Sequence, residues 1–92
     1  MQTKLGSDIL YRTRDKRIYP LSSEKKWIPL AESAGYLCAA NLTPHPPGIP
    51  VICMGEIIDS QVIEYVQALL DSGETVIGLS KEGEVLCCKL LL

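Results

Sequence analysis

The sequence lacks several features that would place it in a class of proteins at once. It has no run approaching about 18 consecutive apolar residues, which argues against a membrane-spanning helix and a membrane partner. Its N-terminus has no apolar stretch of the kind found in secretory signals, so a cytoplasmic location is expected. It has a single histidine and no Cys-x-x-Cys pair, and this scarcity argues against a zinc site.

The composition that remains is that of one small globular domain. The 92 residues are 47% hydrophobic and 22% charged, values near the globular average that argue against a disordered chain. The net charge of −2 conceals an uneven distribution, because residues 1–26 hold seven basic and three acidic side chains while residues 27–92 hold two and eight. We therefore divide the chain into a basic N-terminal arm, 1–26, and a body, 27–92. Since the chain as a whole is acidic and the arm has no known nucleic-acid fold, no nucleic-acid partner is expected.

The four cysteines all lie inside apolar runs, as Cys38, Cys53, Cys87 and Cys88. Cysteines in such surroundings usually act as small buried hydrophobic side chains. Cys87 and Cys88 are adjacent, so in a strand they point to opposite faces and make a poor clamp for a metal. We therefore expect structural cysteines and no bound metal.

Residue patterning predicts two helices. One is expected at 29–34, because Pro29 suits the first position of a helix, where its missing N–H costs nothing. The other is expected at 60–72, because apolar side chains recur there at spacings of three and four. Asp59 or Ser60 is placed to cap the second helix at its N-terminus.

Strands are expected in four short apolar segments, at 36–42, 51–56, 75–79 and 85–91. The last two are separated by a short loop with a glycine, which predicts a hairpin. The fold class is therefore α+β, with a small sheet of about four mostly antiparallel or mixed strands and two helices packed on it.

A proline-dense segment at 44–50, PHPPGIP, follows the first predicted strand. Four prolines in seven residues fix φ repeatedly and remove four backbone donors, so we expect a rigid extended turn. A Gly-Glu pair follows just before the second helix. The candidate residues of this segment and of the Gly-Glu pair are Pro44, His45, Pro46, Pro47, Gly48, Ile49, Pro50, Gly55 and Glu56.

Residues 27–80, read around this segment, resemble the C-terminal domain of the bacterial ornithine/lysine/arginine (Orn/Lys/Arg) decarboxylases. These are fold-type-I enzymes that depend on pyridoxal phosphate (PLP). The family pattern is close to P-Y-P-P-G-I-P, three residues and P-G-E, after a short V-P-L-x-x-A-x-G segment that residues 28–35, IPLAESAG, resemble. Two positions depart from the pattern: His45 stands where the family usually has Tyr, and Met54 where it usually has Pro.

The resemblance implies an accessory domain rather than a catalytic one. In the family a lysine of an S-x-H-K type motif in a large central domain holds the cofactor, and no lysine adjoins a histidine in this sequence. We therefore expect no catalytic residue and no cofactor on this chain alone, and its status as part of an enzyme stays open. The implied role is packing at a subunit interface and active-site entrance, against a PLP-binding decarboxylase domain or subunit, with self-association as a homo-oligomer. The alternative is a free-standing interaction or regulatory module that keeps this fold without enzyme activity.

Three features of the proline-dense segment and the Gly-Glu pair have two interpretations each. Glu56 either caps the second helix or neighbouring amides, or it points at a cationic amine substrate. His45 is either an acid–base group or a turn residue that packs beside prolines. The proline turn either joins two strands with little entropy lost on folding, or it docks a partner as polyproline segments do.

Overall fold

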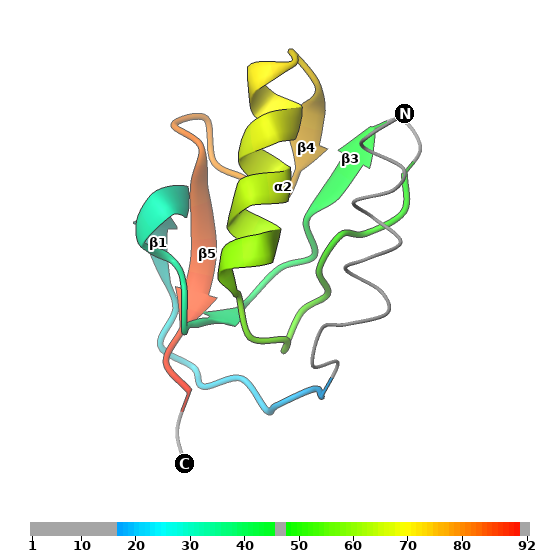
Figure 1. Ribbon diagram of the computed structural model, residues 1–92. Helices are drawn as coiled ribbons and strands as arrows, with labels where there is room; N and C mark the ends of the chain where they lie inside the picture. Colours follow the sequence, from blue (N-terminus) through cyan, green and yellow to red (C-terminus); the bar gives the residue numbers. More distant parts are fainter. Residues whose placement is uncertain (1–16, 46–47, 91–92) are drawn as a thin grey trace.

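A computed structural model describes residues 17–45 and 48–90 (Figure 1). Within these residues the fold is α+β, as predicted from the sequence. The elements in chain order are β1 (Lys26–Pro29), the 3-10 helix η1 (Leu30–Glu32), β2 (Leu37–Cys38), β3 (Thr43–His45), α2 (Ser60–Asp71), β4 (Thr75–Ile77) and β5 (Glu84–Cys88).

The strands form two small antiparallel sheets. In the first, β5 lies in the centre with β1 on one side and β2 on the other. In the second, β3 pairs with β4. Figure 1 shows α2 in front, with β1 and β5 on one side of it and β3 on the other.

The helix α2 forms where its sequence pattern predicts it. Its N-cap is Asp59, whose Oδ1 accepts a hydrogen bond of 2.9 Å from the Val62 amide. Val62, Val66 and Leu69 are buried along one face, at spacings of four and three. Gly73 follows the helix with φ of 84°, a conformation that glycine adopts without strain.

The alternation of side chains along β5 divides the apolar residues into two clusters. Val85 and Cys87 face the main core together with Ile28, Cys38 and the buried face of α2. Cys88 lies in a second, smaller cluster whose other buried members are Leu37 and Ala39. Tyr19 and Leu21 pack against this second cluster. The prediction that the two adjacent cysteines point to opposite faces is therefore confirmed.

The first predicted helix is shorter than expected, and a strand precedes it. Pro29 is the last residue of β1 rather than the first residue of a helix, and only the 3-10 turn of η1 follows. The position suits proline because β1 is an edge strand, where a missing N–H is tolerated. The fold therefore has one α-helix and five strands in the described residues, not two helices and four strands.

The strand expected at 51–56 was wrong. Only one isolated bridge occurs there, between Ile52 and Leu42, and another follows just after it, between Ile57 and Leu37. A tight turn interrupts the segment, since the Glu56 amide donates to the Cys53 carbonyl at 3.1 Å and Gly55 has φ of 94°. This turn also leaves Cys53 exposed, in contrast to the burial expected of all four cysteines.

Of the strand expected at 36–42, only β2 and an isolated bridge at Leu42 form; the next strand, β3, begins at Thr43 and belongs to the other sheet. The predicted C-terminal hairpin is likewise divided, because β4 pairs with β3 while β5 pairs with β1 and β2. A single bridge between Leu79 and Val85 joins the two segments. The cause is a bend at Gly78, where φ is 112° and a Cβ atom would overlap the Asn41 carbonyl. Of the helices in 17–45 and 48–90, none has the length and apolar character needed to cross a lipid bilayer.

Candidate functional site

The proline-dense segment is a loop closed at its base by backbone hydrogen bonds. The Leu42 amide donates to the Ile52 carbonyl at 3.0 Å, and the Val51 amide donates to the Leu42 carbonyl at 2.8 Å. Within the loop, the Gly48 amide donates to the Pro44 carbonyl at 2.8 Å. Pro46 and Pro47 lie outside the described residues. The segment expected to be a turn between two strands begins inside β3, which contains Pro44 and His45, and it leads to the tight turn at residues 53–56 instead of to a second strand.

The side chains of this loop face in different directions. Pro44 is buried in β3, opposite Val76 of β4. His45 is exposed in the same strand, opposite Thr75. Ile49 is 56% exposed, so the loop presents an apolar side chain to its surroundings. Among residues 17–45 and 48–90, no three His, Cys, Asp or Glu side chains are grouped so as to hold a metal ion.

Glu56 serves the 53–56 turn, which consists of Cys53, Met54, Gly55 and Glu56. Its carboxylate Oε1 accepts a hydrogen bond of 3.1 Å from the Cys53 amide, and the residue is only 7% exposed. The helix N-terminus is capped by Asp59 instead. Of the roles predicted for Glu56, the structure therefore shows the capping of a neighbouring amide.

Gly55 is the point where the 53–56 turn meets the segment before β1. The Tyr19 amide donates to the Gly55 carbonyl at 2.8 Å. A Cβ atom on Gly55 would lie 2.8 Å from Ile18 Cγ2 and 3.0 Å from the Tyr19 carbonyl oxygen. Because φ is 94° and the neighbouring backbone is this close, the position requires glycine.

The turn is also tied to the strand beside it. The Cys38 amide donates to the Glu56 carbonyl at 2.8 Å, and the Gly55 amide donates to the Cys38 carbonyl at 2.8 Å. The Met54 amide donates to Asn41 Oδ1 at 2.7 Å. The Gly-Glu pair therefore fastens three separate segments to one another.

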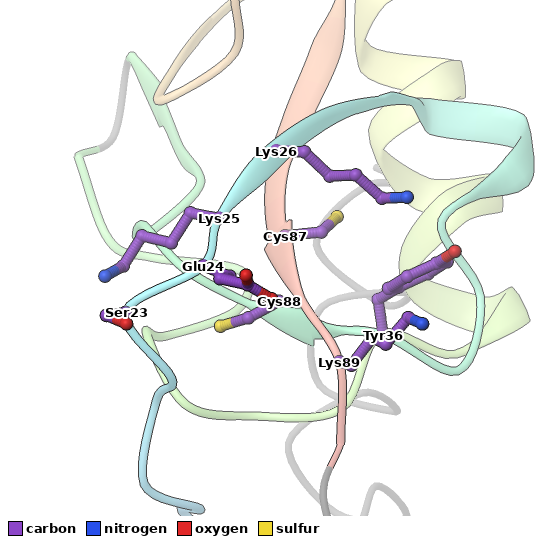
Figure 2. Close-up of a pocket in the computed structure, with 8 residues that line it drawn as sticks. All are labelled: Ser23, Glu24, Lys25, Lys26, Tyr36, Cys87, Cys88 and Lys89. Carbon is purple, nitrogen blue, oxygen red and sulfur yellow. The ribbon is translucent and has the colours of Figure 1, made fainter.

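A second candidate site, which we call the basic hollow, was not predicted from the sequence. It is an open depression of about 430 Å³ beside the end of β5 (Figure 2), lined by Ser23, Glu24, Lys25, Lys26, Tyr36, Cys87, Cys88 and Lys89. Three of the five Lys and Arg residues in the described part of the chain line it, against one of the nine acidic residues. A hollow with this charge attracts anions and disfavours cations.

The lysines of the basic hollow differ in their surroundings. Lys25 Nζ donates a hydrogen bond of 3.2 Å to the Ser22 carbonyl. Figure 2 shows Lys26 on the side of Tyr36 and Lys89, while Lys25 extends in the opposite direction. Strand register produces this grouping, because Lys26 pairs with Cys87 across β1 and β5. The sequence alone did not reveal this site because the pairing of β1 with β5 joins distant segments, and counting charges along the sequence assigned Lys26 to the arm.

The thiol of Cys87 borders the basic hollow, yet it is a poor nucleophile at neutral pH. Its pKa is raised to about 12, mainly by burial and also by the neighbouring Cys38 and Cys88, while Lys26 acts in the opposite direction. None of the described residues of the proline-dense segment lines the hollow. The two candidate sites are therefore separate.

Comparison with known proteins extends the likeness beyond the proline-dense segment. A model of the Orn/Lys/Arg decarboxylase C-terminal domain matches residues 11–86. The arginine decarboxylase of Bacillus subtilis (strain 168) is 43% identical over 51 residues, which cover 55% of this chain and 10% of that protein.

Two solved structures have a similar fold. The lysine decarboxylase of Francisella novicida has a TM-score of 0.58 at 28% identity, over 71% of this chain and 11% of that one. The constitutive lysine decarboxylase of E. coli has a TM-score of 0.61 at 18% identity, over 97% and 13%. This chain thus spans about a tenth of the length of the relatives it matches.

Proposed function

The chain belongs to the Orn/Lys/Arg decarboxylase C-terminal domain family, and from this premise we propose that it is an accessory domain that packs against a PLP-binding decarboxylase domain or subunit. The observation that carries the proposal is the role of the Gly-Glu pair. These two residues of the family pattern hold together a turn, a strand and the segment before β1. They stabilise a fold and carry no arrangement for chemistry of their own.

The surface around the second cluster supports a docking role. Trp27, in the edge strand β1, is 47% exposed and lies opposite Leu86, which packs on that cluster. Ile18 and Met54 are also exposed and flank Gly55. An edge strand beside exposed apolar side chains is typical of an interface with another domain.

The positive charge of the basic hollow disfavours a basic amino acid as its occupant. A basic amino acid carries a cationic side chain at neutral pH, and the lysines of the hollow repel it. The proposed function therefore does not require a substrate to enter the hollow. The proposed contact with a decarboxylase is the apolar surface around Trp27.

Cofactor binding is tested directly on the full chain. PLP is added, and the absorption spectrum is followed for an aldimine band while arginine, lysine and ornithine are supplied and carbon dioxide is measured. A PLP-dependent lysine decarboxylase serves as the positive control. We expect no band and no turnover, and an aldimine band accompanied by turnover would overturn the accessory role.

Partner binding is tested with a tagged chain in extract of its source cell. We expect it to capture a protein that shows the absorption of bound PLP. Trp27→Ala should weaken this capture, whereas Ile77→Ala should not, since Ile77 is also exposed, at 56% against 47% for Trp27, but lies in the other sheet. Equal capture by both variants would contradict the docking surface. Self-association as a homo-oligomer is a further part of the proposal, and size-exclusion chromatography at several concentrations measures it.

One observation favours the alternative of a free-standing interaction or regulatory module. The two departures from the family pattern, His45 and Met54, are both exposed. The chain thus keeps the residues that make the fold and changes residues that a partner would contact. Capture of a partner without bound PLP, weakened by His45→Tyr, would support this module over the accessory domain.

A further inference from the structure

Two buried cysteines face each other across neighbouring strands. Cys38 of β2 and Cys87 of β5 are Cα partners in the antiparallel register. Both belong to the main core cluster, and neither side chain has measurable exposure. Both are thiols in the structure.

The backbone hydrogen bonds identify the kind of pair that they form. The amide and the carbonyl of Cys38 bond to Glu56 and Gly55, on the side away from β5. The following residue, Ala39, donates its amide to the Leu86 carbonyl at 2.8 Å. Cys38 and Cys87 therefore occupy a non-hydrogen-bonded position of the ladder, where facing Cα atoms lie about 4.5 Å apart and side chains are closest.

This spacing matches the requirements of a disulfide. Bridged cysteines have Cα atoms about 4.4–6.8 Å apart, so the two strands need not separate or slide. The other two cysteines do not compete for the bond. Figure 2 shows Cys87 and Cys88 leaving β5 in opposite directions, and Cys53 is exposed in the 53–56 turn.

We propose that Cys38 and Cys87 are a site of oxidative modification, at which a peroxide closes a disulfide that locks β2 to β5. One thiolate attacks a peroxide oxygen, the O–O bond breaks, and a sulfenic acid and hydroxide form. The second thiol attacks the sulfenic sulfur, the S–S bond forms, and water leaves. In total the two sulfurs lose two electrons and two protons, and the peroxide is reduced to two waters.

The surroundings of the pair determine its rate and its pH dependence. Cys87 borders the basic hollow but has no exposed surface, so peroxide reaches the pair from this side when the structure opens locally. The pKa of Cys87 is raised to about 12, mainly by burial and also by Cys38 and Cys88, and Lys26 of β1 opposes this rise. Because the thiolate is the reactive form, oxidation is slow at pH 7 and accelerates about tenfold for each pH unit up to pH 9.

The experiment uses the full chain with Cys53→Ser, which removes the exposed thiol. The protein is treated with hydrogen peroxide at pH 8.5, remaining thiols are alkylated after denaturation, and peptides are mapped by mass spectrometry. We expect loss of two hydrogen atoms, alkylation of one thiol instead of three, and a cross-linked peptide that joins Cys38 to Cys87. The melting temperature should rise by about 10 °C and return after treatment with dithiothreitol.

Two matched variants separate this pair from other thiol chemistry. Cys53→Ser/Cys88→Ser should oxidise in the same way, whereas Cys53→Ser/Cys87→Ser should not form the intramolecular bond. A peptide that joins Cys87 to Cys88 overturns the proposal. So does a protein that keeps all three thiols, or converts them to sulfinic acids, under conditions that oxidise Cys53 in the unsubstituted chain. The peptide map of the unsubstituted chain decides the matter independently of whether any variant folds.

Discussion

Replacement of Gly55 by alanine tests the claim that the 53–56 turn holds the fold together. Two costs add at this position. The first is the φ of 94°, which costs an L-residue about 1–2 kcal/mol. The second is the approach of the new Cβ to the Tyr19 carbonyl oxygen at 3.0 Å. Relief of this contact displaces the segment before β1 and weakens the hydrogen bond from Tyr19 to Gly55, which contributes about 1 kcal/mol.

The matched control is Gly83→Ala. Gly83 has φ of 79°, so alanine there has the same backbone cost, but no atom lies within 4 Å of the new Cβ. We expect Gly55→Ala to destabilise the chain by about 2–4 kcal/mol and Gly83→Ala by about 1–2 kcal/mol. In a domain of this size the difference corresponds to at least about 5 °C in melting temperature.

Thermal unfolding is followed by circular dichroism, since α2 provides a helical signal. Equal melting temperatures for Gly55→Ala and Gly83→Ala would refute the reasoning, because they would show that the contact with Tyr19 contributes nothing. A larger loss at Gly83 would refute it as well.

Three further predictions concern the helix, the core and the turn. Asp59→Ala removes the N-cap of α2 and should lower the free energy of unfolding by about 1 kcal/mol, while Asp59→Asn should keep most of the capping contribution. Chemical denaturation measures both variants, and equal losses would contradict the capping role. Burial raises the pKa of Cys87 to about 12 from 9.0, so the folded state holds its proton more tightly than the unfolded state. The contribution of Cys87 to the free energy of unfolding should therefore be constant below pH 9 and fall between pH 9 and 12 by up to about 1.4 kcal/mol per pH unit. Cys87→Ala should reduce this slope. Met54→Pro should change the melting temperature little in the unsubstituted chain, because it removes the hydrogen bond to Asn41 while it fixes φ. In an Asn41→Ala background, where that bond is already absent, Met54→Pro should raise the melting temperature. An equal effect in both backgrounds would contradict the coupling between Met54 and Asn41.

The parts of the fold that were predicted depend on local signals. The helix α2 has its cap, its apolar periodicity and its terminal glycine within a few residues of one another. The proline-dense segment and the Gly-Glu pair are likewise short and contiguous, so their family resemblance was visible in the sequence alone. Local patterns were enough to locate these features, although distant segments also stabilise them, as Tyr19 and Cys38 do for the Gly-Glu pair.

The parts that were missed depend on pairing between distant segments. The strand β1 is short and ends in Pro29, and it exists because β5 pairs with it. The strand predicted at 36–42 is reduced to β2 because β2 joins β5, while the chain from Thr43 onward joins β4 as β3. The basic hollow has the same origin, since strand register brings Lys26 beside Cys87 and Lys89. No local pattern encodes such a register.

The departure at Met54 shows which part of the family pattern is structural. The turn has a hydrogen bond from the Glu56 amide to the Cys53 carbonyl and a glycine with positive φ at its third position, which is the type II pattern. Proline is favoured at the second position of such a turn, so the P-G-E sequence of the family is explained by turn geometry. Met54 lacks the preset φ of proline, which is worth about 0.4–1 kcal/mol. It has instead an N–H, which Asn41 accepts at 2.7 Å, and a net hydrogen bond contributes about 0.5–1.5 kcal/mol. Because these two contributions are of similar size, the turn tolerates methionine in place of proline. The exchange puts the Met54 side chain, which is 49% exposed, on the surface proposed for the partner.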